Sequence, residues 1–107
     1  MSVERAVDVP IACSLDAGSL ADRAEEWRTL AASSVTSVDA EPTAVCLVLD
    51  PSDEALVAAV ALAQREKECC PFFDVTLDIA ADRRTLSFRV PEGAEAVLAD
   101  FAALLRP

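Results

Sequence analysis

The sequence predicts an α+β fold, a two-layer sandwich in which helices pack on one face of an antiparallel or mixed sheet. The chain has 107 residues, of which 53% are hydrophobic, so it can bury a modest core. Segments that alternate every two residues, as strands do, are interspersed with segments that repeat at helical spacing. We therefore expect a single domain over residues 1–107, with a loose N-terminal tail at residues 1–7.

The predicted order of elements is β-α-β-β-α-β-β-α. Its first six elements match the ferredoxin-like order, and a further strand and a C-terminal helix extend it. The first strand covers residues 9–15, where Cys13 shares a face with apolar neighbours. A helix follows, capped by Asp16 or Ser19. The only tryptophan, Trp27, is expected to anchor this helix in the core, because large aromatic side chains dominate core energetics.

Two strands are predicted in the middle of the chain. Residues 33–40 are rich in Ser, Thr and Val and predict a weak strand, and residues 44–49 predict the strongest strand. Because residues 44–49 are apolar on both faces, we expect a central strand covered on both sides, or by helices on one side and a partner on the other. Cys46 lies within it and is interpreted first as a small core residue.

The second helix is expected to begin with Asp50 as its cap and to end near Glu68. Pro71 cannot continue a helix and favours extended geometry in the residue before it. The adjacent Cys69 and Cys70 therefore lie on either side of the helix end. Helical spacing points their side chains about 100° apart.

The C-terminal third predicts a hairpin with one solvated face, over residues 72–79 and 85–90, and a helix over residues 94–105. The side chains expected to face the core are Phe73, Val75, Leu77 and Ile79 in the first strand, Leu86, Phe88 and Val90 in the second, and Val97, Leu98, Phe101, Leu104 and Leu105 in the helix.

The net charge of −10, from 19 acidic and 9 basic residues, argues against two classes of partner. Nucleic-acid binding needs clustered Lys and Arg, and anionic membranes repel an acidic surface. The sequence shows neither a signal peptide nor an apolar run long enough for a membrane helix. We therefore expect a cytoplasmic protein, in which thiols stay reduced.

Four cysteines and no histidine limit the chemistry available to the chain. The partial negative charge at a helix C-terminus disfavours a thiolate at Cys69 or Cys70, and Glu66 and Glu68 act in the same direction. Only the neighbouring basic residues of the helix, Arg65 and Lys67, would oppose this rise in pKa. Without a histidine base, this setting argues against a cysteine hydrolase.

A soft metal ion would relieve this electrostatic cost, because a coordinated thiol is deprotonated. Cys69 and Cys70 diverge, so a third donor is needed, and we choose Cys13 as the third sulfur. Glu66 is a candidate oxygen ligand on the same side of the helix. Three sulfurs suit mercury, arsenite, cadmium or copper(I), while zinc usually takes four ligands. No organic cofactor is indicated. The residues expected to line and shield the site are Phe72, Phe73 and Cys46.

Two alternatives to a metal or metalloid binding protein remain open. The first is an enzyme that uses vicinal thiols for redox chemistry or for cleavage of a carbon–metal bond. The second is a non-catalytic homodimeric interaction domain with structural cysteines, in which Val45, Leu47 and Leu49 help to form the interface. We favour a protein that is not an enzyme.

The sequence also resembles a known group of proteins along most of its length, from about residue 9 to residue 105. The matching motifs are Ala12-Cys13-Ser14-Leu15, Glu26-Trp27 and the block Glu66 to Phe73, which contains Cys-Cys-Pro-Phe-Phe. They resemble small bacterial proteins associated with MerR-like regulators and heavy-metal resistance loci. The resemblance implies metal or metalloid handling through Cys13, Glu66, Cys69 and Cys70. It also implies a metal-responsive regulator, a reductase or an exporter as partner.

Overall fold

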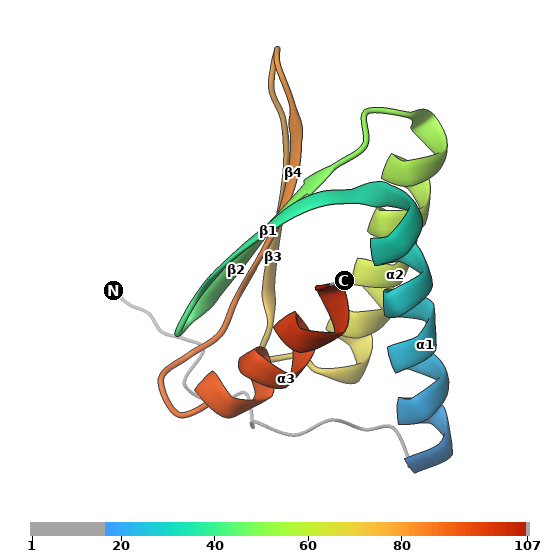
Figure 1. The fold of residues 1–107 in the computed structure, drawn as a ribbon. Helices are drawn as coiled ribbons and strands as arrows, with labels where there is room; N and C mark the ends of the chain where they lie inside the picture. The colour runs from blue at the N-terminus through green and yellow to red at the C-terminus, as the bar shows by residue number, and fades with distance from the viewer. Residues whose placement is uncertain (1–16, 107) are drawn as a thin grey trace.

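The computed structural model describes residues 17–106 and shows an α+β arrangement of two layers (Figure 1). Three helices lie on one face of a four-stranded antiparallel sheet. The elements in chain order are α1 (Ala17–Ser34), β1 (Val35–Glu41), β2 (Ala44–Leu49), α2 (Asp53–Cys69), β3 (Asp74–Ile79), β4 (Arg84–Arg89) and α3 (Glu95–Leu105). No helix within this part of the chain is long and apolar enough to cross a membrane.

The sheet consists of two hairpins joined side by side, with strand order β1-β2-β4-β3. β2 and β4 pair antiparallel from Ala44 opposite Arg89 to Leu49 opposite Arg84. Among the described strands, β1 and β3 form the two edges. The interior strands are β2, between β1 and β4, and β4, between β2 and β3.

The core lies between the sheet and the helices. On β2, Val45, Leu47 and Leu49 are buried, while the residues between them are partly exposed. This alternation places one face of β2 against the helices, and no helix of residues 17–106 lies over the other face. The largest fully buried side chain is Trp27, which packs edge-on against Phe88 with ring centroids 5.6 Å apart.

The sequence predicted most of these elements, and the strand over residues 44–49 coincides with β2. The ferredoxin-like order is not confirmed. The predicted strand over residues 9–15 lies outside the described residues. In a ferredoxin-like sheet this strand would be central, next to β2, but β4 occupies that position. Cover on both faces of β2 is likewise not seen among the described elements.

The predicted start of the second helix was wrong by two residues. Ser52 is the N-cap, and its side-chain oxygen accepts a hydrogen bond from Ala55 N at 3.2 Å. Asp50 instead accepts a hydrogen bond from Ser52 N at 3.2 Å, which stabilises the turn before the helix. A serine hydroxyl and an aspartate carboxylate serve equally well as caps, so composition alone could not separate them.

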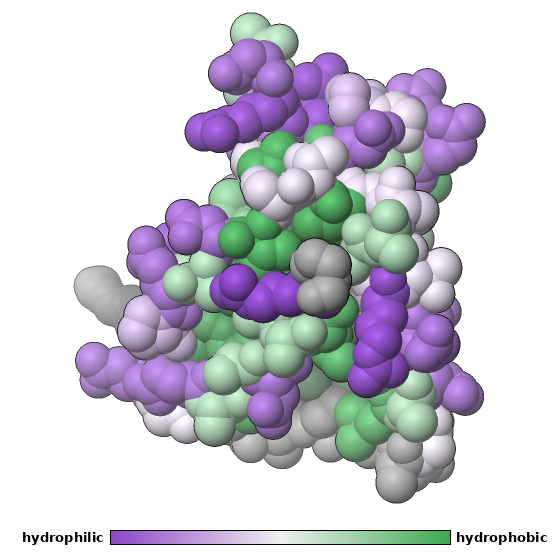
Figure 2. Space-filling model, viewed as in Figure 1, coloured by the Kyte–Doolittle hydropathy of each residue, from purple (hydrophilic) through white to green (hydrophobic). Residues whose placement is uncertain are grey.

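The predicted inward face of the third strand is only partly confirmed. Phe73 is buried, but Leu77 and Ile79 are 37% and 57% exposed. β3 is an edge strand, and the β3–β4 hairpin projects beyond the helical layer (Figure 1). Figure 2 shows that the projecting tip is mainly hydrophilic. Val97 of α3 is also exposed, at 38%, whereas Leu98 beside it is buried.

Candidate metal centre

Three potential metal ligands converge where α2 ends. One donor atom from each of Glu66, Cys69 and Cys70 lies within 4.8 Å of the other two. All three residues are buried, with 7%, 4% and 4% of their surface exposed. The C-terminal end of α2 therefore presents two sulfurs and a carboxylate to one small buried volume.

The local sequence explains how two adjacent cysteines come together. Cys70 N still donates to Glu66 O at 2.7 Å, but Cys70 has already left helical geometry, with φ −125° and ψ 79°. Pro71 enforces this change, since the residue before proline avoids the helical region. The two Sγ atoms consequently lie 3.4 Å apart. The divergence of about 100° expected from an ideal helix does not persist through the helix end.

The turn after α2 is fixed by hydrogen bonds to its backbone. Lys67 Nζ donates to Pro71 O at 2.5 Å and to Phe73 O at 2.7 Å. A cation in the last turn is also favoured by the partial negative charge of the helix C-terminus. Phe73 N donates to Cys70 O at 3.1 Å. These bonds hold the cysteine pair in one arrangement at the end of the helix.

Glu66 accepts hydrogen bonds from residues that sequence reasoning did not assign to the site. Trp27 donates its indole N–H to Oε1 at 2.8 Å, and Arg23 donates to the same oxygen at 3.3 Å. The thiol of Cys70 donates to the other oxygen, Oε2, at 3.5 Å. A sequence signal for this existed, because Arg23 and Trp27 are four residues apart and share one helix face.

The Cys70 thiol is strongly held in its neutral form. Burial raises its pKa to about 12, and the charge of Glu66 and its hydrogen bond with the thiol act in the same direction. The guanidinium of Arg23 opposes the rise. The predicted rise in pKa is confirmed, but burial is its first cause, and the opposing cation comes from α1 rather than from α2. Very little Cys70 thiolate forms near neutral pH, which disfavours Cys70 as a nucleophile.

The cysteines of the described region differ in oxidation state. Cys46 and Cys70 are free thiols, whereas Cys69 is half of a disulfide. A sulfur that is part of a disulfide is not a thiolate ligand. The Glu66–Cys69–Cys70 group can therefore act as a metal centre only after Cys69 has been reduced.

The remaining predicted site residues divide into three groups. Phe72 and Phe73 follow the cysteine pair directly and are buried, with their ring centroids 5.0 Å apart. Cys46 is not part of the donor group, because it alternates with the buried residues of β2 and lies on the opposite face of the sheet. It is half-buried rather than a core residue. Cys13 lies outside the described residues.

Comparison of the chain with protein-family models, with curated proteins and with solved structures finds no match. Two thiols and a carboxylate form a mixed sulfur and oxygen donor set, which suits soft and borderline cations. Among the described residues this group is the one cluster of three cysteine or acidic donors close enough to share an ion.

Proposed function

We propose that this protein binds a soft heavy-metal or metalloid ion at the end of α2, with Cys69, Cys70 and Glu66 as ligands. The observation that carries the proposal is the approach of their donor atoms to within 4.8 Å inside the protein. Two sulfurs 3.4 Å apart can contact a single ion. An ion would also compensate the cost of burying thiolates, since metal coordination deprotonates a thiol outright.

Cys13 completes the proposed ligand set as a third sulfur. This assignment comes from the sequence and from the resemblance to proteins of heavy-metal resistance loci. With three sulfurs, the site suits mercury, cadmium, copper(I) or arsenite. Phe72 and Phe73 would exclude water from the bound ion, because both are buried directly after the cysteine pair.

Because the described ligands are buried, ion exchange requires local opening at the end of α2. A buried, slowly exchanging site fits sequestration of an ion, or its delivery to a partner that opens the site. The partner classes that follow from the resemblance are a metal-responsive regulator, a reductase and an exporter. The net charge of −10 supports delivery to a partner with a basic surface.

A thiol–disulfide reaction is the second candidate, because the free thiol of Cys70 lies 3.4 Å from the oxidised sulfur of Cys69. Attack by the Cys70 thiolate on Cys69 Sγ would form a Cys69–Cys70 disulfide and release the other sulfur as a thiolate. Two features place this function second. The pKa of Cys70, raised to about 12, leaves little attacking thiolate, and a disulfide between adjacent residues closes a small strained ring.

The test is native mass spectrometry of the protein titrated with Hg(II), Cd(II), Cu(I), Zn(II) and arsenite, with and without prior reduction. We expect the reduced wild type to take up one soft ion that the oxidised protein does not take up. The variant Cys69→Ser, Cys70→Ser should lose this ion, and Cys13→Ser should bind it more weakly. Equal uptake by the reduced wild type and the double variant would refute a metal site at the end of α2.

A further inference from the structure

The two oxygens of the Glu66 carboxylate face different parts of the protein. Oε1 faces α1, where Trp27 donates to it at 2.8 Å and Arg23 at 3.3 Å. Oε2 faces the cysteine pair, 3.5 Å from Cys70 Sγ. One oxygen is therefore engaged by two donors, and the other is directed toward the proposed ion.

The groups that hold Oε1 are themselves fixed. Trp27 is fully buried, and its ring packs edge-on against Phe101 with centroids 4.9 Å apart. Arg23 also forms an ion pair with Glu26, in which Arg23 Nε lies 3.5 Å from Glu26 Oε1. The other oxygen of Glu26 pairs with the guanidinium of Arg65 on α2 at 3.0 Å. This chain of charges connects α1 to α2 beside the site. Such outer contacts orient metal ligands and commonly decide the affinity of the ion.

We propose that Arg23 and Trp27 are positioning residues that make Glu66 a one-oxygen ligand and so raise the affinity of the site for Cd(II) and Zn(II) more than its affinity for Cu(I) and arsenite. The inference rests on the proposed function, because it concerns which ion that same site prefers. A carboxylate whose second oxygen is engaged by two donors coordinates through one oxygen only.

The chemistry of the ions explains the expected preference. Zinc and similar divalent ions accept thiolate and carboxylate ligands together, with one oxygen from Asp or Glu in many sites. Copper(I) is a soft ion and takes thiolate and thioether ligands. Arsenite likewise bonds to sulfur and gains little from a carboxylate oxygen. A fixed oxygen next to two sulfurs therefore adds binding free energy for Cd(II) and Zn(II) and little for Cu(I) or arsenite.

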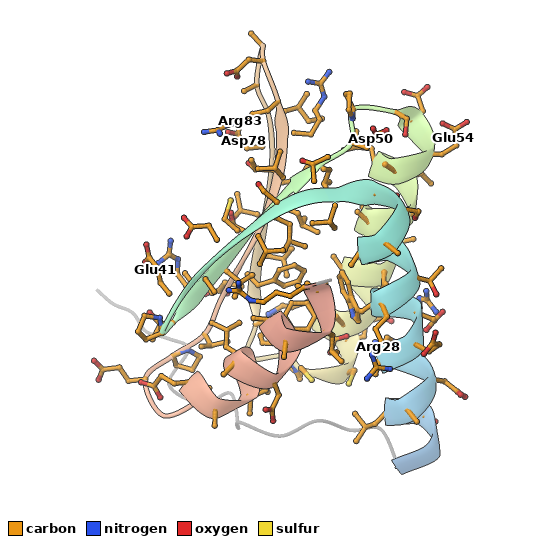
Figure 3. All side chains as sticks on the ribbon, in the orientation of Figure 1. Arg28, Glu41, Asp50, Glu54, Asp78 and Arg83 are labelled. Carbon is orange, nitrogen blue, oxygen red and sulfur yellow. The ribbon has the colours of Figure 1, made fainter. Side chains whose placement is uncertain are left out.

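The experiment measures Cd(II) and Cu(I) affinities of the fully reduced chain by competition with chromophoric chelators, with X-ray absorption spectra of the Cd(II) form. The variants are Arg23→Met and Trp27→Phe. The matched control is Arg28→Gln, which removes an exposed arginine of the same helix whose ion pair with Glu25 spans 3.3 Å (Figure 3). We expect the first two variants to lose about 10–100-fold in Cd(II) affinity, as outer-contact variants of metal sites do, with little change for Cu(I).

Wild type should show one oxygen beside sulfur in its Cd(II) spectrum, and Arg23→Met should show that oxygen contribution altered. Arg23→Lys, which keeps the positive charge, should recover part of the Cd(II) affinity. Trp27→Phe changes a core residue, so circular dichroism must show that this variant folds. If it does not fold, Arg23→Met still tests the inference. A sulfur-only Cd(II) spectrum, or an unchanged ratio of Cd(II) to Cu(I) affinity in Arg23→Met, would overturn the inference and leave the metal site standing. Absence of any ion from reduced wild type would overturn both.

Discussion

Cys70 and Cys46 are both free thiols, but they lie on opposite faces of the sheet. Cys70 belongs to the buried core and lies within hydrogen-bonding distance of a carboxylate and a second sulfur. Cys46 is half-buried on the face that no described helix covers. Across the sheet it pairs with Asp39 and Ser87, at an ordinary position in a strand.

This difference shows that neighbouring groups, rather than the residue type, define a candidate site. Cys46, in a strand with ordinary polar neighbours, belongs to no group of three potential metal ligands among the described residues. At the end of α2, a proline, a buried glutamate and an adjacent cysteine together create such a group around Cys70. Direct comparison of Cys70 with Cys46 tests this distinction by experiment.

Thiol reactivity should give the largest contrast. The rise in the pKa of Cys70 from 9.0 to about 12 lowers its thiolate fraction near neutral pH by about 1000-fold. In protein that has not been reduced, iodoacetamide should therefore alkylate Cys70 about 1000 times more slowly than it alkylates an ordinary exposed thiol, and more slowly than the half-buried Cys46. Peptide mapping by mass spectrometry at timed quenches measures both rates in the same sample.

The pH dependence of Cys70 alkylation is part of the same prediction. A raised pKa means that the thiolate appears only at high pH, so the Cys70 rate should rise about tenfold per pH unit up to about pH 12. Replacing Glu66 by Gln should shift the increase in alkylation rate to lower pH, because the charge of the carboxylate helps to raise the pKa of Cys70. A Cys70 rate equal to that of Cys46 at pH 7 would contradict the assignment.

Metal affinity should give the second contrast. Cys70→Ser removes a proposed ligand. It should lower Cd(II) affinity by about 100-fold or more, the largest loss typical of variants that change only outer contacts of a metal site. Cys46→Ser should bind the ion as wild type does, because Cys46 is not part of the donor group. Competition titrations of reduced protein with Cd(II) measure both, and a comparable loss in Cys46→Ser would show that the ion binds elsewhere.

The sequence predicted the four described strands and the approximate bounds of the three described helices, because these depend on local patterns. The apolar run of residues 44–49 and the helix-ending Pro71 needed no tertiary information. The site was predicted less completely. Glu66 was found because it lies one turn before Cys70 on the same helix. Its partners Arg23 and Trp27 are 43 and 39 residues away, and only the packing of α1 on α2 brings them to it.

The same reasoning explains why Cys46 was misjudged. An apolar strand predicts a central position, and β2 is central, but the pattern does not show which face is covered. Likewise the exposure of Ile79 follows from the place of β3 at the sheet edge, which depends on how the two hairpins pair. Local sequence specifies which elements form, and the pairing between elements specifies what each side chain contacts.

Conformational stability should give the smallest contrast between the two thiols. Cys70→Ala removes a buried sulfur and its hydrogen bond to Glu66 from a packed core, which should cost about 1–2 kcal/mol of unfolding free energy. Cys46→Ala changes a half-buried position on the face that no described helix covers and should stay within about 0.5 kcal/mol of wild type. Urea unfolding followed by the fluorescence of Trp27 reports both, since this residue is buried in the core. If Cys46→Ala were the more destabilising change, the face of β2 that no described helix covers would have to be covered in solution, and the homodimer considered from the sequence would gain support.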